Sequence, residues 1–127
     1  MAEQTFHKNE KLCGQMRIKV LYQQGRRFVA WPLRVTWQPT PGAPTTQVLI
    51  WAPKSLFKHA VDRNRMRRLM REAYRKHKHL LPADYTCQIA FNYMEKTQQP
   101  LETIERGIRK ALLRCAADMD KQETQQA

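Results

Sequence analysis

Basic side chains gather in residues 54–79, and their types and spacing suit contact with a polyanion. This stretch holds ten Lys or Arg residues against two acids, a net +8 out of the +12 of the whole chain. Arginine offers planar, paired donors that match phosphate oxygens. Arginines three or four residues apart on a helix also repel one another, by roughly a few tenths of a kcal/mol per pair. We therefore expect a phosphate-rich partner rather than a plain solvated face, since solvated faces usually alternate the two signs of charge.

A helix must present these charges, and the spacing predicts one over about residues 57–77. Apolar side chains recur at the interval of one helical face and can pack on a core: Met66, Leu69, Met70, Ala73 and Tyr74. Polar side chains then project from the rest of the cylinder: Arg63, Asn64, Arg67, Arg68, Arg71 and Arg75.

The centre of this helix carries a family resemblance. Arg63-Asn64-Arg65, followed by alternating basic and apolar positions and then by Arg71-Glu72-Ala73-Tyr74, resembles the RNR-motif helix of the bacterial ribonuclease P protein subunit. Flanking segments agree with that family in order and spacing: residues 9–12, Gly25, residues 48–54 and Asp84-Tyr85. The resemblance covers roughly residues 6–115.

The resemblance implies a non-catalytic subunit of an endoribonuclease. In that family the RNA subunit holds the active site and Mg²⁺, while the protein helps to bind precursor tRNA so that its 5′ leader is removed. The protein alone would be a monomer that binds no cofactor, and Mg²⁺ would be held mainly by RNA. The helix and the lysine turn before it would lie against the catalytic RNA through these residues: Lys54, Lys58, Arg63, Asn64, Arg65, Arg67, Arg68, Arg71 and Arg75.

The resemblance also implies a cleft for the single-stranded leader, between the first helix and a face of the sheet. Single strands stack their bases on aromatic side chains that lie beside basic ones. By position, Ile18 and Tyr22 occupy two aromatic cleft sites of the family, so only Tyr22 keeps a ring. We assign Phe28 and Tyr93 to the same cleft, with the alternative that large aromatics of this kind are buried in the core.

The other ionisable residues form no catalytic set. The acids lack the close pairs or His-flanked groups of a metal-dependent nuclease or a general acid–base pair. The four Gly residues leave no loop that could cradle a phosphate. His59, His77 and His79 flank the basic helix and are expected to contact RNA or solvent. We expect the polypeptide alone to catalyse nothing.

Length and composition bound the remaining possibilities. The 127 residues suffice for one domain, with an ordered part of about 6–117 and a polar C-terminal tail at 118–127. Three cysteines lie far apart without zinc-ligand spacing, and Cys87 and Cys115 fall on apolar stripes, which predicts buried thiols in a reducing compartment. No signal sequence or membrane-length apolar run is present. We expect a cytoplasmic protein with no membrane partner.

Periodicity predicts the elements around the basic helix. A short helix is expected at residues 15–24, a strand at 26–37 that Pro32 makes irregular or an edge, and a strand at 45–52 buried on both faces. Residues 85–93 alternate as a strand, and Pro100 opens a last helix. The fold class is α+β, a single-domain two-layer sandwich with the order α-β-β-β-α-β-α. A β-α-β link crosses right-handedly on general grounds, but the resemblance implies a left-handed crossover, and that is our prediction.

Other functions remain open. A structural RNA-binding protein of ribosomal type would share the charge but lack a leader cleft, so a Tyr22 buried on a flat face would favour it. A DNA-binding regulator would need a helix just upstream of residues 62–79, where a strand is predicted. A self-sufficient nuclease would need the metal–carboxylate set that is missing.

Overall fold

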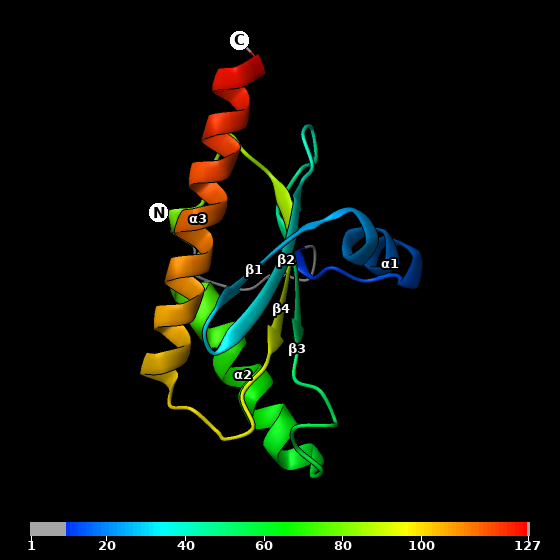
Figure 1. The fold of residues 1–127 in the computed structure, drawn as a ribbon, viewed down its shortest axis with the longest axis vertical. Coiled ribbons are helices and arrows are strands. Elements are labelled where there is room, and N and C mark those ends of the chain that lie inside the picture. The colour runs from blue at the N-terminus through cyan, green and yellow to red at the C-terminus, as the bar shows by residue number, and fades with distance from the viewer. Residues whose placement is uncertain (1–9, 127) are drawn as a thin grey trace.

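The computed structural model describes residues 10–126 (Figure 1). The elements follow the predicted order α-β-β-β-α-β-α, with a 3₁₀ turn, η2, after the second helix. Their bounds are α1 (Gln15–Gln24), β1 (Arg26–Ala30), β2 (Leu33–Pro39), β3 (Gln47–Trp51), α2 (Ala60–His77), η2 (Lys78–Leu80), β4 (Cys87–Tyr93) and α3 (Leu101–Gln126).

The four strands form one mixed sheet in the order β1-β2-β4-β3. The pairs β1–β2 and β2–β4 are antiparallel, whereas β3 and β4 are parallel neighbours joined through α2. This arrangement brings the basic helix across one face of the sheet. The left-handed sense of the crossover stays a prediction.

The segment predicted as one irregular strand is a hairpin. Ala30 pairs with Leu33, and the chain reverses at Trp31 and Pro32, whose peptide bond is cis. Proline has no N–H to donate to a ladder, so a reversal is a natural outcome at this position. The carbonyl of Pro32 accepts a bond from the Met94 N–H, which ties the turn to the end of β4.

The strand predicted to be buried on both faces lies at an edge of the sheet. Val48 is buried, but Trp51 is exposed, so burial on both faces is wrong. An apolar run does not tell a central strand from an edge strand that is covered on one face. The outer side of β3 meets the N-terminal segment at an isolated parallel bridge between Lys11 and Val48.

The last helix runs further than predicted. Residues 118–126, expected to be a polar tail, continue α3 as far as Gln126. Buried Met119 extends the apolar stripe by one turn beyond Cys115. No Gly or Pro follows Gly107, so nothing in the sequence stops the helix.

Apolar side chains fill both sides of the sheet unequally. The main core lies between the sheet and the pair α2 and α3, as Figure 1 shows, and contains Trp37, Phe91, Tyr93, Met66 and Met70. On the opposite face α1 covers a smaller cluster of Leu12, Leu21 and Ala90, with Ile18, Tyr22 and Leu49 packed against it. The predicted two-layer sandwich thus carries a further helix on its second face. Cys87 and Cys115 are buried free thiols as predicted, and none of the helices described could span a membrane.

Candidate nucleic-acid interface

The basic helix α2 is anchored by its apolar stripe. Met66, Met70, Ala73 and Tyr74 are buried against the sheet and α3, as the spacing predicts. The rest of the helix surface and the turn before it carry the polar and charged residues, which divide into a supporting set and an exposed set.

The supporting set is held by bonds within the protein. The Arg63 guanidinium donates to the carbonyls of Phe57 and Lys58 at 2.8 and 3.0 Å, so it fixes the turn that leads into α2. Arg67 donates to the side-chain oxygen of Asn64. These three predicted contact residues therefore hold the shape of the helix start, which limits how freely their side chains can meet a partner.

Arg75 is also committed to a neighbour. It bonds both oxygens of Glu72, with Nη2–Oε1 at 2.5 Å and Nε–Oε2 at 3.2 Å, and this pairing lowers the pKa of Glu72. Lys76 lies 3.5 Å from Glu105 of α3. Few acidic residues lie near α2, and two of them, Glu72 and Glu105, pair with Arg75 and Lys76.

The exposed set has no ion-pair partner among residues 10–120, whose side chains the structure describes. It consists of Lys54, Lys58, Arg65, Arg68 and Arg71. Arg68 and Arg71 line a hollow of about 310 Å³ together with Lys11, Glu72 and Arg75. Lys11 and Arg71 also line a smaller one, of about 150 Å³, along the outer edge of β3. Two of the five exposed cations, Arg68 and Arg71, thus line a groove between α2 and the N-terminal segment.

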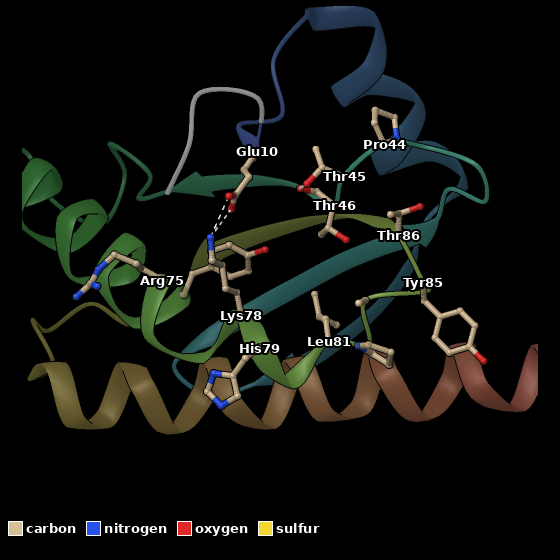
Figure 2. Close-up of a pocket in the computed structure, with 13 residues that line it drawn as sticks. Glu10, Pro44, Thr45, Thr46, Arg75, Lys78, His79, Leu81, Tyr85 and Thr86 are labelled. Atoms are coloured by element: carbon tan, nitrogen blue, oxygen red, sulfur yellow. Dashed lines mark hydrogen bonds and ion pairs between the residues drawn. The ribbon is translucent and has the colours of Figure 1, made fainter. Parts of the chain in front are cut away.

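A buried ion pair sets the position of that N-terminal segment. The Lys78 ammonium donates to both carboxylate oxygens of Glu10 at 2.9 and 3.3 Å, and Glu10 is almost fully buried. Figure 2 shows this pair beside a hollow at the end of α2, with Thr45, Thr46 and Thr86 across from it and Arg75 and His79 pointing away. Because Lys11 follows Glu10, the pair places Lys11 beside α2.

A separate hollow of about 470 Å³ opens between α1, the second face of the sheet and the turn before α2. It is lined by Tyr22, Arg27, Arg34, Thr36, Pro53, Ser55, Leu56, Asn92, Tyr93 and Met94. The Tyr22 hydroxyl donates to Asn92 Oδ1 at 3.1 Å and lies 2.9 Å from Asn92 Nδ2, so the amide holds the ring at the hollow. Tyr22 is half-buried in a groove rather than buried on a flat face.

Comparison with known proteins decides the family. The model of the family described as ribonuclease P matches residues 6–116. The chain belongs to the ribonuclease P protein family. It is 34% identical over 119 residues to the ribonuclease P protein component of Porphyromonas gingivalis, a match that covers 88% of this chain and 87% of that one. It is 37% identical over 82 residues to the corresponding component of Chlorobium phaeobacteroides, covering 61% and 56%.

Solved structures agree on the fold. The RNase P protein of Thermotoga maritima matches with a TM-score of 0.71 at 18% identity, over 83% of this chain and 96% of that one. The RNase P protein of Staphylococcus aureus matches with a TM-score of 0.66 at 19% identity, over 84% and 94%. The family resemblance inferred from the RNR helix is confirmed. The chain is a protein component of the ribonuclease P holoenzyme, which acts in tRNA processing, and such a component associates with the RNase P RNA.

Two rings that we assigned to the leader cleft are packed in the main core. Phe28 is 9% exposed and lies in the main core under the guanidinium of Arg114. The ring of Tyr93 is packed on Phe57 in the same core, and its hydroxyl donates to the Thr97 carbonyl. The alternation of β1 and β4 turns both rings toward α2 and α3. Phe28 is therefore a core residue, the alternative given above, whereas Tyr93 also lines the hollow beside α1 and its place in the cleft stays a prediction.

Ile18 and Tyr22, by contrast, lie on the α1 face as assigned, and that face carries cationic residues that the sequence analysis missed. Arg27 and Arg34 line the hollow from β1 and β2. The sequence could have indicated these arginines, because each lies next to an apolar residue of its strand that faces the main core. Strand alternation then turns the arginine to the opposite face. No group of three or more His, Cys, Asp or Glu able to hold a metal ion occurs in the described part of the chain.

Proposed function

We propose that this subunit binds the catalytic RNA through α2 and its lysine turn, and the 5′ leader of precursor tRNA through the hollow beneath α1. It thereby assists Mg²⁺-dependent cleavage at the mature 5′ end, as one cytoplasmic domain. The observation that carries the RNA contact is the exposed set: five cations, in and just before the helix that carries the family's motif, that have no acidic partner within residues 10–120. The Mg²⁺ ions would be held mainly by the RNA.

The two sets of α2 residues would contribute differently. The exposed set would meet phosphates directly, since Arg and Lys pair with phosphate oxygens through charge-assisted bonds. The supporting set would act mainly by holding the helix in shape, at its start through Arg63, Asn64 and Arg67 and near its end through the Arg75–Glu72 pair.

The leader would lie in the hollow beside Tyr22. A single strand suits a basic groove with an aromatic platform, and here the Tyr22 ring lies with Arg27 and Arg34 around one hollow. A structural RNA-binding protein without a substrate would not need this groove.

Charge reversal tests the RNA contact. Arg68→Glu with Arg71→Glu should reduce association with the catalytic RNA at least a hundredfold, because two phosphate contacts become repulsions. Arg109→Glu, an exposed arginine on α3, is the matched control and should change association little. The single changes Arg68→Ala and Arg71→Ala should each lower the slope of log affinity against log salt by about 1. Unchanged association of the double variant would refute the assignment of α2.

A further inference from the structure

We propose that Trp51 is a second stacking platform for an unpaired base of the leader, at the rim of the hollow beside Tyr22. This inference rests on the leader hollow proposed above, and it adds a residue from the edge strand to it.

The register of the sheet places Trp51 next to the residue that holds Tyr22. Trp51 pairs with Asn92 across β3 and β4, and Asn92 is the amide bonded to the Tyr22 hydroxyl. Leu49, two positions earlier, packs in the cluster beneath α1, so strand alternation turns Trp51 to the same face. Pro53, two positions later, lines the hollow. Trp51 therefore lies beside two residues that line the hollow, Asn92 and Pro53, and on the same face of the sheet as Leu49.

The indole of Trp51 is not used by the fold. It is 47% exposed, while its neighbour Ala52 is buried in the main core. Within residues 10–120 it makes no hydrogen bond that the structure records, whereas the equally exposed Trp31, at 50%, donates from its indole nitrogen to Glu95 Oε2 at 3.1 Å. A large ring that is neither buried nor bonded remains available to a ligand.

The charges around Trp51 indicate what that ligand is. Arg34 lies in the same row of the sheet, on the other side of Asn92, and exposed Lys54 follows three residues after Trp51. An aromatic ring with cations on both sides is the arrangement that binds single-stranded nucleic acid, with the base on the ring and phosphates on the cations. An apolar protein partner would not require this single sign of charge.

The test compares substrates with and without a leader. The holoenzyme is assembled from this protein and the catalytic RNA of its own organism, and equilibrium binding of precursor tRNA and of mature tRNA is measured. Trp51→Ala should weaken binding of precursor tRNA about tenfold and leave that of mature tRNA unchanged, because one stacked base is lost. Trp51→Phe should retain most of the affinity, and Trp31→Ala should change neither substrate.

A spectroscopic readout guards against loss of folding in Trp51→Ala. In a Trp31→Phe background, a leader oligonucleotide added to the holoenzyme should quench the fluorescence of Trp51, while buried Trp37 gives a constant signal. Absence of quenching would overturn the proposal. So would wild-type binding of precursor tRNA by Trp51→Ala, or equal weakening of both substrates.

Failure of this inference can be told from failure of the leader hollow. If Tyr22→Ala loses leader-dependent binding while Trp51→Ala does not, the hollow stands and Trp51 is excluded. If the unmodified holoenzyme binds precursor and mature tRNA equally, the proposed leader contact itself is wrong, and Trp51 falls with it.

Discussion

At the scale of single residues, the arginines of α2 are chemically alike but differ in what they do. The Arg63 guanidinium donates to two backbone carbonyls, whereas Arg68 is exposed and lines the groove with Lys11. The basic motif in the sequence includes both arginines but does not distinguish their roles, because the difference arises from the turn that folds back onto Arg63.

This difference predicts opposite effects of two alanine substitutions. Arg63→Ala should lower the free energy of unfolding by about 1–2 kcal/mol, because bonds from a charged donor to partly buried carbonyls are lost. Arg68→Ala should leave stability within about 0.5 kcal/mol and weaken association with the catalytic RNA. Urea unfolding and RNA binding of the two variants check this. A stability loss in Arg68→Ala equal to that in Arg63→Ala would contradict the division.

At the scale of elements, an ion pair helps to hold the N-terminal segment, beside its bridge to β3. Lys78→Met should destabilise the protein by about 1–3 kcal/mol, because the Glu10 carboxylate would stay nearly buried without its main donor. Lys76→Met removes the same charge from a more exposed pair and should cost less than about 1 kcal/mol. Denaturant unfolding of both variants measures the two losses of stability. Equal losses would contradict the larger contribution of the buried Glu10–Lys78 pair.

The elements also show how much of the fold can be predicted from the sequence. The spacing of apolar residues predicts α2 well, since Met66, Met70, Ala73 and Tyr74 are all buried. Alternation in a strand separates two faces but does not say which face meets which helix, and this is why Phe28, a core residue, was assigned to the cleft. Pro32 signalled an irregularity, yet only the pairing of Ala30 with Leu33 reveals the hairpin. The hollow beside Tyr22 is lined by five separate segments of the chain, so no local pattern could predict it.

At the scale of the whole molecule, the buried thiols and phenols link stability to pH. Burial raises the pKa of Cys87 to about 12 and that of Tyr93 to about 12, and it also raises the pKa of Cys115. An unfolded cysteine ionises near pH 8.5, so between that pH and 12 the unfolded chain binds fewer protons than the folded one. The stability that these groups contribute is therefore complete below about pH 8.5 and is lost as the pH rises.

Urea unfolding between pH 8 and 11 measures this loss. Each buried cysteine should contribute a slope of up to about −1.4 kcal/mol per pH unit. Cys87→Ala should remove one such share, although it lowers stability at pH 8. Exposed Cys13→Ala is the control and should leave the slope unchanged. A wild-type stability that stays flat up to pH 11 would contradict the burial of the thiols.

The whole molecule carries the two surfaces that we propose bind RNA, the groove beside α2 on one side of the sheet edge and the hollow beneath α1 on the other face. One measurement tests their joint role most directly: cleavage of precursor tRNA at low Mg²⁺ by the organism's catalytic RNA, with and without this protein. We predict that cleavage at the mature 5′ end appears only when the protein is present, and that Arg68→Glu with Arg71→Glu abolishes it. Equal cleavage rates with and without the protein would contradict the proposed role of the subunit.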